Sequence, residues 1–191
     1  MIRIDEKKYI KKAAAGDTGA FEYLVLQYQP QVYRLAFRMT NHPEDAADLT
    51  QEVFLKAWNN LDKFEFKSAF STWLYRLASN LCIDFLRNNR RRQNLPLTFE
   101  DEEGEEQRIE VLDPAPLPEE RVIAAEGQAR LSAAMEELEP EHRQILTLRV
   151  VNDLSYADIA EILGVKEGTV KSRLARAREK LRKIITNEEQ K

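Results

Sequence analysis

A single glycine, Gly164, separates two helical patterns near the C-terminus, and this arrangement restricts the fold more than any other feature of the chain. The first pattern begins with Ser155, which can cap a helix, and Asp158 three residues later fits a capping box. Gly164 can adopt the left-handed conformation that ends a helix. A second pattern starts soon after Lys166, so residues 154–183 are predicted to form a helix-turn-helix.

The second helix of this motif has two chemically different faces. Its basic face is dense, because residues 166–183 contain 8 basic and 2 acidic side chains. A solvated face on an ordinary helical hairpin is the alternative, but the cap, the turn glycine and the two matched faces together favour DNA binding. The other face is apolar and is expected to pack on the domain through Val170, Leu174, Ala177 and Leu181.

The residues of the basic face can be assigned separate tasks in a major groove. Ser172 and Arg176 lie one turn apart in the N-terminal part of the helix, so they are predicted to contact base edges. An arginine that forks onto guanine O6 and N7 supplies about 1 to 3 kcal/mol of discrimination, and Ala175 can contact a thymine methyl group. Phosphate contacts, which fix register without reading sequence, are predicted for Lys171, Arg173 and Arg178.

The rest of the chain also favours helices. Its 191 residues include only 6 Gly and 7 Pro, and Ala, Leu, Glu, Arg and Lys dominate. We expect an all-α protein with two small helical domains, residues 1–95 and 121–191. A long helix around residues 21–39 contains Pro30, which can kink it. The other helices are expected over residues 4–15, 43–61, 70–92, 121–138, 140–150, 155–163 and 167–185.

Charge is distributed unevenly along the chain. The net charge is −4, but residues 1–95 carry 15 basic and 11 acidic side chains and residues 121–191 carry 13 and 12. Residues 96–120 carry 1 basic and 10 acidic side chains, with four prolines and few large apolar residues. This middle segment is therefore predicted to be a flexible acidic linker.

Several classes of site are not indicated by the sequence. Cys82 cannot form an internal disulfide and is interpreted as a small core residue, while His42 and His142 have no cysteine at ligand spacing. No phosphate-binding glycine loop or nucleophile elbow occurs. We therefore expect no catalytic residue, no metal, no cofactor and no enzyme. The N-terminus lacks an apolar stretch of signal-peptide length, which favours a cytoplasmic protein that is not inserted in a membrane.

Strings of residues in both predicted domains resemble one known family. LSYADIAEILGVKEGTVKSRLARAREKLR resembles region 4 of bacterial sigma factors, whereas FEYLVLQYQPQVYRLAFRMT, DLTQEVFLKAW and FSTWLYRLASNLCIDFLR resemble region 2. The short chain, with a linker where a third domain would lie, is similar to the extracytoplasmic-function (ECF) group. The resemblance implies an alternative sigma factor, often for a stress or envelope response, with RNA polymerase core, promoter DNA and an anti-sigma factor as partners.

The resemblance also implies site residues. Region 2 would bind the β′ clamp helices through Asp48, Gln51, Glu52, Leu55 and Lys56, and region 4 would hold the β flap and read the −35 element. The segments that would capture unpaired −10 bases contain Phe64, Lys67, Arg76, Ser79, Asn80 and Arg87. Stacking on an aromatic ring and pairing with an amide suit that task. It is equally possible that Phe64 or Phe66 packs in the core and does not stack on a base. Trp73 is interpreted as a core residue rather than as a side chain that separates the DNA strands.

Other interpretations of the whole chain remain open at this point. An ordinary helix-turn-helix repressor could use an N-terminal domain for dimerisation or ligand sensing, and a small nuclease would need clustered carboxylates or histidines, which the sequence lacks.

The weak overall charge predicts poor promoter binding without polymerase. A 25-residue linker can span roughly 80 Å, and elements about 16 base pairs apart are separated by on the order of 55 Å. The acidic linker could imitate RNA or be a solvated tether.

Overall fold

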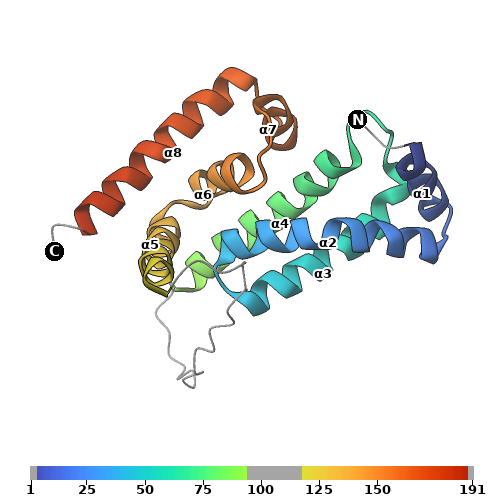
Figure 1. The fold of residues 1–191 in the computed structure, drawn as a ribbon. Coiled ribbons are helices and arrows are strands. Elements are labelled where there is room, and N and C mark those ends of the chain that lie inside the picture. The colour runs from blue at the N-terminus through green and yellow to red at the C-terminus, as the bar shows by residue number, and fades with distance from the viewer. Residues whose placement is uncertain (1–3, 94–117, 189–191) are drawn as a thin grey trace.

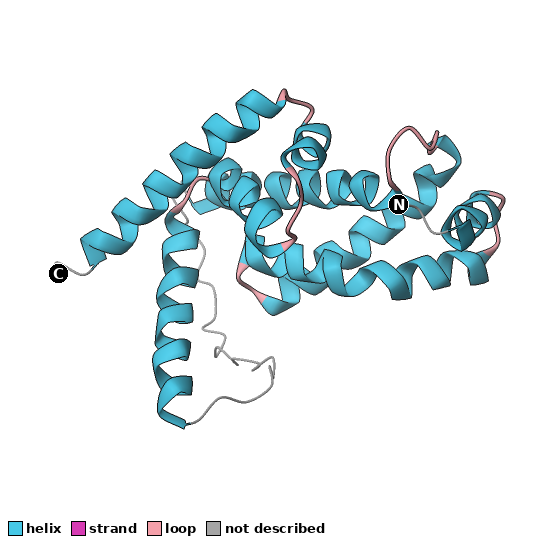
Figure 2. Cartoon of the chain, turned by 45° about the horizontal axis from the view of Figure 1, so that its top comes forward, coloured by secondary structure: helices cyan, strands magenta, loops and turns pink. Residues whose placement is uncertain are grey.

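The computed structural model describes residues 4–93 and 118–188, and within these ranges every regular element is helical (Figures 1 and 2). The all-α prediction is confirmed. The predicted linker, residues 96–120, lies outside the described residues except for its last three, which belong to a helix. The N-terminal half contains α1 (Ile4–Ala14), α2 (Thr18–Thr40), α3 (Pro43–Asn60), the short 3-10 turn η1 (Leu61–Lys63) and α4 (Phe70–Gln93). The C-terminal half contains α5 (Pro118–Glu137), α6 (Pro140–Leu146), η2 (Thr147–Val151), α7 (Tyr156–Leu163) and α8 (Glu167–Glu188).

Local caps explain where the N-terminal helices begin and end. The carboxylate of Asp17 accepts a hydrogen bond from the Ala20 amide at 2.9 Å and caps α2. Asn41 ends α2 in the left-handed region, at φ 57°. His42 then caps α3, whose first residue is Pro43. Pro30 lies inside α2 without dividing it into two helices.

Helices α2, α3 and α4 pack against one another and α1 covers one end of α2 (Figure 1). Their contact surfaces supply a core of large side chains that are almost completely buried, among them Leu24, Leu35, Val53 and Leu74. Cys82 belongs to this core, and burial raises the pKa of its thiol to about 12. The interpretation of Cys82 as a core residue is confirmed.

The C-terminal half differs from the prediction at one point. The helix expected over residues 140–150 is α-helical only to Leu146 and continues as a π-helix from Thr147 to Val151. The Asn152 amide donates to the Thr147 carbonyl, five residues back, at 3.2 Å, and Leu154 donates to the Leu148 carbonyl at the same distance. This π-helical segment directs the chain toward α7, while Thr147 and Leu148 remain buried.

The two halves pack on each other, which residue patterns within each half did not predict. Helix α4 contacts α6 and α7, α2 contacts η2, and one buried cluster contains residues of both halves. Arg143 on α6 is 5% exposed and donates to the Met39 carbonyl at 2.5 Å and to the Glu136 carbonyl. These carbonyls lie in the last turns of α2 and α5, where a helix leaves its oxygens without internal partners. Burial lowers the pKa of Arg143.

Candidate nucleic-acid interface

Helices α7 and α8 form the predicted helix-turn-helix. The Ser155 hydroxyl accepts from the Asp158 amide at 3.1 Å, and the Ser155 amide donates to the Asp158 carboxylate at 3.2 Å. Gly164 ends α7 in the left-handed region at φ 64°. The capping box and the turn glycine are therefore confirmed, and together they fix the angle at which α8 leaves α7.

Replacing Ser155 with Ala is expected to lower the free energy of unfolding by about 1 kcal/mol, because the amide of Asp158 loses its partner at the helix end. Urea denaturation followed by circular dichroism measures this change. Ser155→Thr keeps a capping hydroxyl and serves as the control. An equal loss in both variants would contradict the capping explanation.

Helix α8 divides into the two faces that its sequence predicted. Val170, Leu174 and Ala177 are at most 2% exposed, and Leu181 is partly buried. The Ser172 hydroxyl donates to the Thr169 carbonyl at 3.0 Å, so it would meet a base mainly as an acceptor. All six side chains that were assigned to DNA are exposed: Lys171, Ser172, Arg173, Ala175, Arg176 and Arg178.

The ring of Tyr156, at the start of α7, contacts two cationic side chains beside this surface. Local sequence patterns did not predict these contacts. The Lys171 ammonium lies 5.8 Å from the centre of the Tyr156 ring, and the Arg149 guanidinium lies 5.4 Å from it. Arg149 also donates to the Leu154 carbonyl at 2.9 Å. Tyr156 and Arg149 therefore join η2, α7 and α8, a relation that depends on tertiary structure and has no simple sequence signal.

A mostly apolar groove of about 520 Å³ runs between α2 and α3. Leu55 lines it and is 64% exposed. Of the five residues predicted to contact polymerase, Gln51 and Leu55 line the groove, whereas Asp48, Glu52 and Lys56 are exposed on the same helix. Glu52 and Lys56 form an ion pair at 3.1 Å. We refer to this feature as the α2–α3 groove; its walls are Phe21, Val25, Gln29, Tyr33, Ala47, Thr50, Gln51, Phe54, Leu55 and Trp58.

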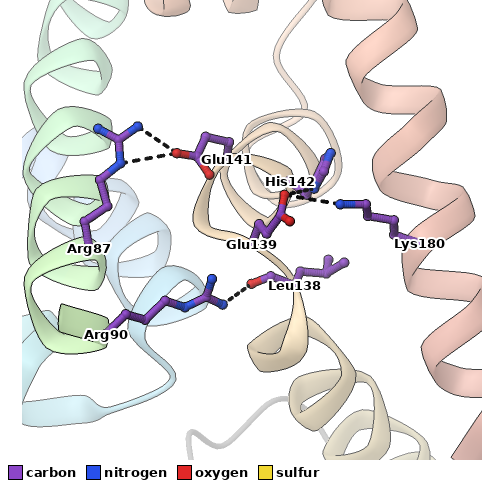
Figure 3. A network of polar contacts seen from close by, with 7 residues as sticks. All are labelled: Arg87, Arg90, Leu138, Glu139, Glu141, His142 and Lys180. Carbon is purple, nitrogen blue, oxygen red and sulfur yellow. Dashed lines mark hydrogen bonds and ion pairs between the residues drawn. The ribbon is translucent and has the colours of Figure 1, made fainter. Parts of the chain in front are cut away.

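The residues predicted to read the −10 element fall into different environments on α4. Asn80 is exposed, whereas Ser79 is 1% exposed and its hydroxyl has no partner among the described residues. Arg76 donates to the Glu161 carbonyl at 2.6 Å. Arg87 donates to the Glu141 carboxylate through Nε at 3.2 Å and Nη2 at 2.7 Å (Figure 3). This hydrogen bond lowers the pKa of Glu141.

The loop before α4 places one predicted base-stacking residue in the core. Phe64 is 7% exposed, and its ring centre lies 4.9 Å from that of Phe66, 5.7 Å from Phe70 and 5.3 Å from Trp73. The alternative in which Phe64 seals the core therefore describes this structure, because its ring has no open face for a base. Lys67 is exposed and pairs with Glu65, which raises the pKa of Lys67.

The described residues hold neither a helix suited to cross a membrane nor a cluster of metal-binding side chains. No helix within residues 4–93 and 118–188 has the length and apolarity that crossing a membrane requires. In the same ranges, no group of three or more His, Cys, Asp or Glu side chains is arranged to hold a metal ion.

Comparison with known proteins gives a consistent result. Residues 24–92 match the family described as Sigma-70 region 2, and residues 128–181 match Sigma-70, region 4. The ECF RNA polymerase sigma factor SigW of Bacillus subtilis is 36% identical, over 94% of this chain and 96% of its own. The RNA polymerase sigma-H factor of Pseudomonas aeruginosa is also 36% identical, over 94% and 93%. The sigma factor RpoE of Bartonella quintana, solved in complex with the anti-sigma factor NepR, matches 87% of this chain and 96% of its own with 25% identity and a TM-score of 0.61.

Proposed function

Because the chain belongs to the ECF group of the sigma-70 family of RNA polymerase sigma factors, we propose that three of its surfaces divide the work of promoter-specific initiation. The α2–α3 groove binds core polymerase, α4 reads the −10 element and α8 reads the −35 element. The family consists of transcription factors rather than enzymes. The observation that carries this proposal is the surface of α8, where all six residues assigned to the −35 element are exposed on the second helix of a capped helix-turn-helix.

The α2–α3 groove supports a contact with a helix of the polymerase. It combines apolar walls with an exposed leucine and a charged flank on α3. Grooves of this kind bind amphipathic helices, whose apolar side chains enter the groove while polar ones face the rim. The β′ clamp helices, which the family resemblance implies as partner, have this form. Leu55 would enter the apolar contact, and Asp48, Glu52 and Lys56 would set its orientation.

Helix α8 supports sequence-specific contact with the −35 element. Its exposed arginines can donate to guanine and to phosphates, and its buried face fixes its position on the domain. The net charge of −4 limits how strongly the isolated chain can bind DNA. Polymerase is therefore expected to supply much of the affinity for promoter DNA, and α8 is expected to select the base sequence.

Asn80 is exposed on α4, and Asn80→Ala is expected to slow open-complex formation about tenfold. Its amide can pair with the edge of a base that has left the duplex, and losing one such contact costs on the order of 1 to 3 kcal/mol. Potassium permanganate footprinting of the melted region measures the effect. Asn88→Ala, at another exposed position of α4, is the matched control. Equal slowing in both variants, or none in Asn80→Ala, would contradict the role of Asn80.

We also propose that an anti-sigma factor restrains this chain. The Bartonella quintana relative was solved with such a partner, and it shares most of the present fold. Co-purification of the tagged chain from its host before and after envelope stress tests this partner, which should be released under the inducing condition. A partner whose association does not change with any such stress would contradict restraint.

The proposed function is tested by reconstitution with core polymerase and run-off transcription across the genome. We expect new transcripts whose start sites share two upstream elements about 16 base pairs apart, on the order of 55 Å along the duplex. A gel-shift titration of the same promoters with the chain alone should show weak binding. Tight specific binding without polymerase, together with no new transcripts, would identify a repressor instead.

A further inference from the structure

Helix α1 carries a face of exposed lysines that none of the three proposed surfaces includes. The match to Sigma-70 region 2 covers residues 24–92, so α1 lies outside it. Ile10 and Ala13 are 0% and 3% exposed and pack α1 against α2. At 100° per residue, the four lysines of α1 lie within an arc of about 140° on the opposite side of the helix. All four are exposed, and we call them the α1 lysine face: Lys7, Lys8, Lys11 and Lys12.

The α1 lysine face has no carboxylate at ion-pair distance among the described residues. Glu6 of α1 is held by α2 instead, because it accepts a hydrogen bond from the Tyr28 hydroxyl. Other lysines of the chain do have a carboxylate partner: Lys56, Lys67, Lys180 and Lys183. In a chain with a net charge of −4, this face is therefore a local concentration of uncompensated positive charge, which attracts anionic groups.

Two contacts connect the α1 lysine face with the loop before α4. The Lys7 ammonium lies 5.4 Å from the centre of the Phe66 ring, and α1 packs against η1, where the loop begins. Lys63 and Lys67 at the two ends of this loop are also exposed. The loop is one of the segments expected to capture unpaired −10 bases. The α1 lysine face therefore extends that site beyond α4.

Aromatic rings border the α1 lysine face on both sides. Phe66 lies beside Lys7, and on the other side Tyr9 stacks on Tyr23, with ring centres 4.0 Å apart and an angle of 17° between the rings. Tyr23 is 39% exposed. Positive charge combined with accessible rings is typical of surfaces that bind single-stranded nucleic acid, because unpaired bases stack on the rings while the cations follow the phosphates. A base-paired duplex does not offer such free base faces.

The path of the chain indicates which part of a promoter passes α1. Gln93 ends α4, and from there the chain continues to the half that is proposed to read the upstream −35 element. The other end of α4, with the loop and α1, therefore faces downstream of the −10 element. There the strands have to separate to expose the template at the start site, so an unpaired strand passes this end of the molecule.

We propose that the α1 lysine face binds phosphates of the unpaired promoter strand immediately downstream of the −10 element. This inference rests on the proposed function, because it takes α4 and the preceding loop to hold the −10 bases. It adds a contact that holds the opened strand without reading its sequence, as phosphate contacts do.

Fluorescence anisotropy of a labelled oligothymidine strand of about 12 nucleotides tests this surface in the full chain. The test variant is Lys8→Gln with Lys11→Gln and Lys12→Gln, and it keeps Lys7, which contacts Phe66. A rescue variant changes the same three lysines to Arg. The matched control removes three positive charges from exposed positions of α2 and α8 that belong to none of the proposed sites: Arg34→Gln, Arg182→Gln and Lys183→Gln.

We expect the test variant to bind the strand at least about tenfold more weakly at about 50 mM salt. The slope of log affinity against log salt concentration should fall by about 2, since each phosphate contact with a single strand contributes about 0.7. The rescue variant should bind within about twofold of the wild type, and the control should lose less than about threefold. Equal losses in the test variant and the control would overturn the proposed surface. An equal loss of affinity for a duplex of the same length would overturn its assignment to an unpaired strand.

A separate arm distinguishes this inference from the proposed function. The wild-type chain is mixed with core polymerase, and run-off products are measured. If no products form, the proposed function fails, whereas a loss of oligothymidine binding in the test variant alone still supports the α1 lysine face. If products form but the test variant and the control bind the strand equally well, the function stands and the contact through α1 is wrong.

Discussion

Leu55→Asp is expected to weaken binding to core RNA polymerase at least about 30-fold. The side chain is 64% exposed and lines the α2–α3 groove, so in a complex it would be buried against apolar groups. The few apolar residues that dominate an interface contribute about 2 kcal/mol or more each, and a carboxylate at this position would have to leave water without a partner. Titration of fluorescently labelled chain with core polymerase, read by anisotropy, measures the dissociation constant.

Leu26→Asp is the matched control for this variant. Leu26 is 67% exposed on α2 but is not part of the groove lining. The same change of chemistry should therefore alter polymerase binding less than about twofold, in line with the small effects of most surface contacts. Equal losses in the two variants would show a general effect of the added charge, and no loss in Leu55→Asp would place the polymerase contact elsewhere.

Arg176→Ala is expected to reduce transcription from promoters with an intact −35 element by about 5- to 150-fold. This range corresponds to the 1 to 3 kcal/mol that a bidentate arginine–guanine contact contributes. Arg176 is exposed on α8, opposite the face that holds Leu174 and Ala177 in the core. Polymerase binding should not change, because the α2–α3 groove lies on other helices. In vitro transcription from a set of promoters that differ only in the −35 element provides the measurement.

Arg178→Ala separates base reading from phosphate binding. Loss of a phosphate contact should weaken all promoters by a similar factor and reduce the salt dependence of binding by about one ion. Arg176→Ala should instead flatten the preference among −35 sequences. If both variants keep the wild-type order of promoter strength, Arg176 does not read a base.

Most of the helical architecture could be predicted from local sequence. Asp17 marks a helix start through its side-chain carboxylate and Pro43 through its fixed backbone angle. Ser155 and Gly164 define the turn of the helix-turn-helix. The two faces of α8 also follow from the spacing of residues within one helix. Such features need no information about the rest of the molecule, and the observed elements agree with them.

Features that depend on distant contacts could not be predicted in this way. One wall of the α2–α3 groove comes from residues 21–33 and the other from residues 47–58. The helical spacing of Phe21 and Val25 is the same as that of core residues, because sequence spacing does not show that a surface remains uncovered. The π-helical turn after Leu146 also depends on tertiary context, since Thr147 and Leu148 are held in the core.

The loop before α4 shows the same limit on a smaller scale. Phe64 and Lys67 lie three residues apart in a segment that alternates aromatic and charged side chains. Only the packing of Phe64 on Phe70 and Trp73 distinguishes a core ring from an exposed one. Local sequence predicted a helix that contains Arg76 and Arg87, but the partners of these two arginines are on helices more than 50 residues away in sequence.

The contacts of Arg143 affect how the molecule unfolds. Its guanidinium ties the last turn of α2 to the last turn of α5, and the surrounding buried cluster is shared by both halves. Removing either helix would leave a buried cation without its acceptor. The two halves therefore form one cooperative folding unit, and fraying of either half alone is suppressed.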